Sequence, residues 1–202
     1  RDVGLSTKLS GRKVGNINRM ILQGFAGIRV KAPYTLMDMA DDVAGLLSFL
    51  SIDRAHIVGA SLGGMIAQCV AILHPSRVIT LTSIMSHTGR VSFTMSYPKA
   101  MLTLLGPAAN SVAESQDNAM TFTEVCGSTG FRIDEDEIRD RAGRAYERCF
   151  YPKGFVRQLA ALLATGNRTK ALGQLRVPTL VLHGSADPLI RPMGGEETAA
   201  AI

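Results

Sequence analysis

The chain has 202 residues, enough for one domain with an inserted subdomain, and 46% of them are hydrophobic, which excludes global disorder. Its formal net charge of +5 comes from scattered basic residues without interleaved aromatics, so nucleic acid is not an expected partner. No apolar run approaches the roughly 18 to 20 residues that cross a bilayer, so no membrane span is expected.

Three cysteines, Cys69, Cys126 and Cys149, are far apart and form no C-x-x-C pair. No histidine stands at a spacing that would complete a metal site with them. We expect free thiols, which suit a reducing compartment, and therefore a cytoplasmic protein. No metal and no organic cofactor is expected.

The first part of the chain contains one clear helix signal. Residues 11–32 are mixed, basic and turn-rich, and are expected to form a loop. Thr35 and Asp38 have capping-box spacing and predict a helix start. The apolar positions that follow predict a buried stripe made of Leu36, Met39, Ala40, Val43, Leu46, Leu47 and Leu50. Asp41 and Asp42 follow Asp38 in the first turns, where the helix dipole favours acid, and this interpretation is preferred over a metal site.

The most informative stretch spans residues 54–74. Ala55 to Val58 is a short apolar run suited to a buried parallel strand, and Leu62 to Leu73 is apolar almost all round, as in a helix packed on a sheet. The connection between them reads G-x-S-x-G. A dinucleotide fingerprint would need G-x-G-x-x-G, and a serine stands where its second glycine should be, so that alternative is disfavoured.

Ser61 stands in the middle of this sharp strand-to-helix turn. Such a turn requires an unusual backbone angle at the serine, and it predicts that Gly59 and Gly63 lie too close to their surroundings for a Cβ. The first N–H groups of the helix point at an oxygen lodged beside the serine. Ser61 is therefore a candidate nucleophile and the Leu62 N–H is half of a candidate oxyanion hole. The alternative is a glycine-rich turn with no function.

A second buried strand is predicted at residues 77–85, followed by Ser86, His87, Thr88 and Gly89. Ligands bind at the carboxyl ends of parallel strands in such folds. His87 is therefore a candidate pocket residue, and the alternative is a polar group satisfied within its own loop.

Residues 90–176 are Met-rich and helical in character, without a strand-like run. Acidic residues 134–137 precede four arginines, which predicts an exposed helix rather than a phosphate site. The apolar and aromatic side chains expected to pack this segment on the core, a few of them lining an apolar pocket, are Phe93, Met95, Tyr97, Met101, Phe122, Phe131, Tyr146, Phe150, Tyr151 and Phe155.

A last buried strand begins at Val177 and leads to Asp187. His183 lies inside this strand and before the aspartate, and it is interpreted as structural.

The segment V-G-A-S-L-G-G at residues 58–64 resembles the nucleophile elbow of the α/β-hydrolase superfamily, and the surrounding sequence is similar to its aclacinomycin methylesterase-like carboxylesterases over nearly the whole chain. The resemblance implies an α/β fold, with a partial parallel sheet, flanking helices and an inserted helical cap. It implies a first core part at 1–89, the cap at 90–176 and a second core part at 177–202.

The resemblance also implies a role for Asp187 and the lack of some of the family's strands. Asp187 matches the acid of the family's P-x-L-x-x-x-G-x-x-D segment, which orients a catalytic histidine that follows later in the family, and no histidine lies beyond His183. Residues 1–8 resemble the end of a loop after the family's fourth strand. The chain is thus expected to lack the N-terminal strands with their H-G dipeptide, and the C-terminal strand with its base.

The predicted function is a serine hydrolase that cleaves a small-molecule carboxylic ester through an acyl-enzyme, incomplete and inactive as this fragment. The alternative is a catalytically dead domain of the same fold that binds a ligand or a partner. The oligomeric state is left open.

Overall fold

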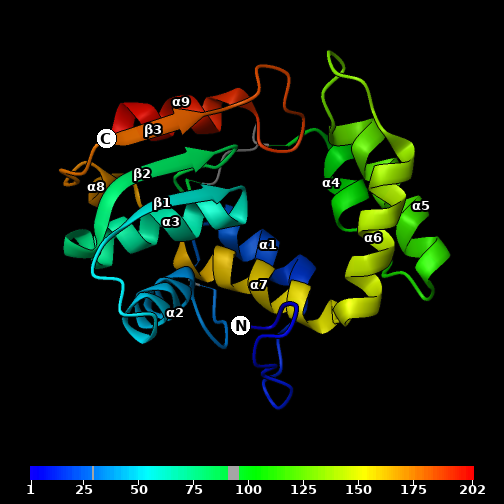
Figure 1. The fold of residues 1–202 in the computed structure, drawn as a ribbon, viewed down its shortest axis with the longest axis horizontal. Helices are drawn as coiled ribbons and strands as arrows, with labels where there is room; N and C mark the ends of the chain where they lie inside the picture. Colours follow the sequence, from blue (N-terminus) through cyan, green and yellow to red (C-terminus); the bar gives the residue numbers. More distant parts are fainter. Residues whose placement is uncertain (29, 91–95) are drawn as a thin grey trace.

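The computed structural model describes residues 1–28, 30–90 and 96–202, so the predicted cap residues Phe93 and Met95 lie outside the described residues (Figure 1). The elements are, in chain order, α1 (Ile17–Phe25), α2 (Leu36–Phe49), β1 (Ala55–Ala60), α3 (Leu62–Leu73), the 3₁₀ turn η1 (Pro75–Arg77), β2 (Val78–Ile84), α4 (Pro98–Leu104), α5 (Val112–Cys126), α6 (Glu135–Cys149), α7 (Pro152–Thr165), α8 (Thr169–Leu172), β3 (Thr179–Leu182) and α9 (Pro192–Ala201).

The three described strands form one parallel sheet in the order β1-β2-β3. Partner residues form rows across it, and Val58, Thr82 and Leu180 make one such row. The row at the carboxyl edge joins Ala60, Ile84 and Leu182. Because all strands run in one direction, the loops after them emerge at one edge, and the arrowheads in Figure 1 point toward the side where α4, α5 and α6 stand.

Helix α3 covers one face of this sheet. It lies against β1 and β2, and α2 packs on its other side. Met65 and Val70 of α3 pack in one cluster with Leu36 of α2 and Leu81 of β2, and all four are at most 2% exposed. The nearly all-apolar surface of α3 is explained by this position between a sheet and a second helix.

The opposite face of the sheet is exposed. Val58, Leu180 and Leu182 point to it and are 64%, 53% and 45% exposed. Parallel sheets are usually covered on both faces, so this uncovered face is unusual.

Two sequence predictions about the first helices need correction. The predicted loop at 11–32 contains α1, whose N-cap Asn16 accepts a hydrogen bond from the Arg19 N–H. In α2 the capping box is present as predicted. Leu46 and Leu50, however, are 57% and 53% exposed rather than buried, because the helix turns their side away from α3.

Helices α4, α5 and α6 pack on one another and stand beside the sheet (Figure 1). Helix α7 instead packs against α1 and α2, and α8 packs against α3 and α9. The boundaries of the cap at 90–176 remain a proposal, and within that range α7 and α8 contribute to the core. No helix in residues 1–28, 30–90 and 96–202 has both the length and the apolarity to cross a membrane.

Candidate active site

Ser61 occupies a strained turn between β1 and α3. Its φ of 53° and ψ of −122° lie outside the regions that L-residues usually adopt, a conformation that costs on the order of 1 to 3 kcal/mol. Its N–H donates to the Ile84 carbonyl at 2.9 Å, and its carbonyl accepts from the N–H of Gly64 and Met65 at 3.0 and 3.1 Å. The Ser86 hydroxyl donates to the same carbonyl at 2.7 Å. Four hydrogen bonds therefore hold the serine backbone in this conformation.

The glycines around Ser61 have different surroundings. A Cβ on Gly59 would lie 2.2 Å from the Gly63 carbonyl oxygen, so position 59 is closed to a side chain as predicted. A Cβ on Gly63 would meet nothing within 4 Å, so the predicted reason for glycine there is wrong. The second crowded position is Gly64, where a Cβ would lie 2.1 Å from the Ser86 hydroxyl oxygen.

Leu62 is the first residue of α3. The first N–H groups of a helix have no intrahelical partner, and the Ser61 side chain does not cap them. The positive end of the helix dipole therefore lies next to the candidate nucleophile, which suits a developing oxyanion.

Asp187 lies in the loop after β3. Its Oδ1 accepts hydrogen bonds from the N–H groups of Leu189 and Ile190 at 2.9 and 3.0 Å. β2 separates β1 from β3, so the ends of the two outer strands are roughly 10 Å apart at the usual strand spacing. Ser61 and Asp187 thus both follow strands that end at the same edge of the sheet.

His87 is buried in the loop after β2. Its Nδ1 accepts from the Gly89 N–H at 2.9 Å, so its hydrogen is on Nε2. Burial first, and then the positive charge of Arg168 and the neighbouring His183, lower the pKa of His87 to about 3. A general base works best with a pKa near the working pH, so His87 does not fit that role.

The other three histidines are engaged elsewhere. His56 Nδ1 pairs with the Thr80 hydroxyl at 2.8 Å, and His74 Nε2 pairs with Asp41 at 2.8 Å. His183 Nε2 lies 2.6 Å from the Ile190 carbonyl oxygen. None of the four histidines has a hydrogen bond to Ser61 in the described structure.

Sequence reasoning missed a buried polar network behind the site. Arg168 is 2% exposed, and its guanidinium donates to Gln68 Oε1 at 3.2 and 3.3 Å and to the His87 carbonyl at 2.8 Å. Gln68 in turn donates to the Ser83 hydroxyl at 3.1 Å. The network ties the loop after β2 to α3 and to the segment after α7. Gln68 inside an otherwise apolar helix was its only signal in the sequence.

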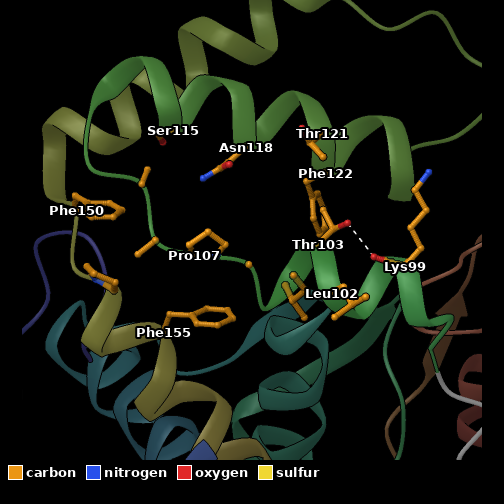
Figure 2. A pocket seen from close by; sticks show the side chains of 15 residues that line it. Lys99, Leu102, Thr103, Pro107, Ser115, Asn118, Thr121, Phe122, Phe150 and Phe155 are labelled. Carbon is orange, nitrogen blue, oxygen red and sulfur yellow. Dashed lines mark hydrogen bonds between the residues drawn. The ribbon is translucent and has the colours of Figure 1, made fainter. Parts of the chain in front are cut away.

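A groove of about 760 Å³ lies among α4, α5 and the start of α7. Figure 2 shows Phe122, Phe150 and Phe155 around it, with Asn118 and Thr103 as polar neighbours. All three aromatics were predicted to pack or line the cap. Ser61, His87 and Asp187 are not among the residues that line this groove.

Comparison with known proteins finds relatives that are hydrolases. The chain matches the family model described as the alpha/beta hydrolase fold over residues 3–202. It is 30% identical over 152 residues to the 2-hydroxy-6-oxononadienedioate/2-hydroxy-6-oxononatrienedioate hydrolase of Paraburkholderia xenovorans, covering 75% of this chain and 52% of that protein. It is 25% identical to rhodomycin D methylesterase DnrP of Streptomyces peucetius, covering 84% of this chain and 63% of that one.

Among solved structures, a hydrolase from Pseudomonas aeruginosa matches with a TM-score of 0.63 and 25% identity, over 87% of this chain and 63% of that chain. A thermophilic esterase from Thermogutta terrifontis matches with a TM-score of 0.59 and 25% identity, over 87% and 62%. The chain therefore spans between 52% and 63% of the length of these four proteins.

Proposed function

Because the chain belongs to the α/β-hydrolase fold family, we propose that it contains the nucleophile and the acid of a serine hydrolase that cleaves carboxylic esters through an acyl-enzyme. The observation that supports this most is the backbone of Ser61, held by four hydrogen bonds in a strained conformation at the start of a helix. Strain of this kind is concentrated at functional sites.

The chemistry follows from the positions of the groups. Ser61 Oγ attacks the acyl carbon and its proton passes to a base, while the Leu62 N–H stabilises the oxyanion. The base returns the proton to the alkoxide that leaves. Water then attacks the acyl-serine and releases the acid. Asp187 orients the base and stabilises its charged form.

The base is not among the four histidines of residues 1–202, because each has a partner away from Ser61 or too low a pKa. We therefore assign it to a part of the protein outside these residues. Removing the base of a serine triad costs about 10⁶ in rate, or about 8 kcal/mol, so the 202-residue chain alone is expected to be nearly inert.

The groove beside α4 and α5 supports a substrate with an apolar or aromatic group. Its volume of about 760 Å³ is within the usual range for small-molecule sites, and three phenylalanines supply flat apolar surface. We assign it to the acyl or alcohol part of the ester.

Exogenous imidazole tests this proposal on the chain as it stands. Imidazole is small enough to take the place of the absent base next to Asp187. We expect a fluorophosphonate probe to label Ser61 slowly without imidazole and at least about tenfold faster with it, as measured by peptide mass spectrometry.

Three variants serve as controls. Ser61→Ala should abolish the labelling, and Asp187→Asn should remove most of the imidazole effect. His56→Gln, on the open face of the sheet, should label like the wild type. The proposal would be overturned if imidazole did not accelerate labelling, or if Ser61→Ala were labelled like the wild type.

A second candidate function is a ligand-binding domain without catalysis. The observation that favours it is that neither Ser61 nor Asp187 is among the residues that line the groove. In that case an apolar ligand would bind equally well to wild type and to Ser61→Ala, and imidazole would not promote labelling.

A further inference from the structure

The loop that contains Asp187 is held at each of its backbone carbonyls from 188 to 190. The Pro188 carbonyl accepts from the Tyr97 N–H at 2.8 Å, and the Leu189 carbonyl accepts from the Ser96 hydroxyl. The Ile190 carbonyl accepts from His183. We call residues 187–190 the acid turn. Its two inner N–H groups, of Leu189 and Ile190, both donate to Asp187 Oδ1.

His183 lies at the end of β3 with its side chain 8% exposed. Its Nε2 is 2.6 Å from the Ile190 carbonyl oxygen and 3.5 Å from Asp187 Oδ2. A carbonyl oxygen only accepts, so the hydrogen is on Nε2. The other ring nitrogen, Nδ1, is buried with no hydrogen-bond partner in the described structure. The hydrogen bonding of the ring described in the structure is therefore on its Nε2 side.

Asp187 Oδ1 and His183 both hydrogen bond to the backbone of Ile190, one at its N–H and the other at its carbonyl. A displaced carbonyl would rotate the chain at 190 and weaken the bond to Oδ1. Because Oδ1 is occupied by two N–H groups, Oδ2 is the oxygen left for a catalytic base.

We propose that His183 is a positioning residue: its Nε2–H fixes the acid turn and thereby presents Asp187 Oδ2 to the base. This inference rests on the proposed hydrolase function for its catalytic consequence. That His183 fixes the acid turn is argued from the contacts alone. This role extends the structural role predicted for His183.

The first turn of α9 presses the ring into place. A Cβ on Gly195 would lie 2.7 Å from His183 Nδ1 and 2.9 Å from its Cβ and Cγ. The ring therefore lies directly against the helix backbone, and glycine is required beside it. A methyl group at 195 would push the ring from its place without removing the imidazole.

Side chains with differently placed donors test the proposal. In His183→Gln an amide nitrogen can take the position of Nε2, whereas in His183→Asn it takes the position of Nδ1. His183→Met fills the space without a donor. We expect amide exchange at Leu189 and Ile190, measured by NMR, to be about tenfold faster in the Met and Asn variants and near wild type in the Gln variant.

Imidazole-dependent labelling of Ser61 gives the second readout. The Met and Asn variants should need several times more imidazole for half-maximal labelling. His183→Gln should restore the wild-type requirement, which a loss of folding would not explain. Gly195→Ala should behave like His183→Met, and it tests the same contact if the Met variant does not fold.

The outcomes separate the two proposals. Unchanged exchange at Leu189 and Ile190 in the Met variant would overturn the role of His183 whatever the labelling shows. Faster exchange with an unchanged imidazole requirement would overturn positioning and leave a role in the fold only. A wild type that imidazole never activates would refute the hydrolase, while exchange would still show whether His183 holds Asp187.

Discussion

Gly59 and Gly63 are symmetric in the G-x-S-x-G motif, but only one of them is crowded. The space that a Cβ at 59 would need is filled by the Gly63 carbonyl, 2.2 Å away. Position 63 has free space and an ordinary helical setting in the first turn of α3. The motif therefore combines a steric requirement for glycine at position 59 with no such requirement at position 63.

This difference predicts opposite effects of one methyl group. Gly59→Ala should lower the free energy of unfolding by about 1 to 3 kcal/mol, because the backbone of α3 must move. Gly63→Ala should leave it unchanged or raise it by up to about 1 kcal/mol, because alanine is a better helix former. Urea denaturation of both variants gives the comparison, and equal losses would contradict the geometry at the elbow.

At the scale of elements, one buried ion pair joins the N-terminal loop to α7. Arg157 donates to both carboxylate oxygens of Asp2 at 2.8 Å, and the two side chains are 4% and 0% exposed. The hydrogen bonds from Arg157 lower the pKa of Asp2 to about 2, from an ordinary value of 3.8. The carboxylate therefore contributes its full stabilisation above pH 3.8, and that contribution is lost as the pH falls through about 2.

Arg157→Met should lower the free energy of unfolding at neutral pH by about 3 to 5 kcal/mol, because a buried carboxylate loses its partner. The difference in free energy of unfolding between wild type and Arg157→Met should become about 2 kcal/mol smaller as the pH is lowered through the pKa of Asp2. The exposed pair of Arg144 and Asp140, at 2.9 Å, gives the matched control. Arg144→Met should cost less than about 0.5 kcal/mol, with no change of this difference in acid.

Sequence could predict the elements whose determinants are local. The capping box of Thr35 and Asp38 and the turn at Ser61 depend on neighbours within a few residues, and both are present. The predicted α/β-hydrolase fold is confirmed by the family match. The roles of Ser61 and Asp187 remain predictions, because no contact described here joins them.

What sequence did not reveal depends on distant partners. Residues 17–25 form helix α1 in place of the predicted loop, and Met20 of this helix is buried in a cluster with Ala160 of α7. Arg168 reaches Gln68, which lies 100 positions earlier in the chain. Helix α1 does carry local signals, the N-cap Asn16 and apolar residues at helical spacing, whereas the pairing of Arg168 with Gln68 leaves no short-range signal because the two residues are far apart in the chain.

At the scale of the whole molecule, one face of the sheet exposes apolar side chains that no described residue covers fully. The row of Val58, Thr82 and Leu180 crosses all three strands, and its two outer members are 64% and 53% exposed. Exposed apolar residues on the face of a sheet favour association with other chains.

The double substitution Val58→Lys with Leu180→Lys should raise the monomeric fraction of the 202-residue chain, measured by gel filtration with light scattering. Its free energy of unfolding should change by less than about 1 kcal/mol, because both side chains already contact water. Leu81→Lys, on the covered face at 0% exposure, should instead prevent folding. A double variant that unfolds would show that this face is packed.

The positive φ at position 61 means that the serine hydroxyl is present at a cost in the stability of the fold. Glycine adopts this conformation without penalty, whereas serine does so only under strain. A Ser61→Gly chain would lose the hydroxyl proposed to attack the ester, and its free energy of unfolding would rise because the strain at this position is relieved. The strain at Ser61 therefore lowers the stability of the fold relative to glycine, a loss that the proposed role of Ser61 as nucleophile would explain.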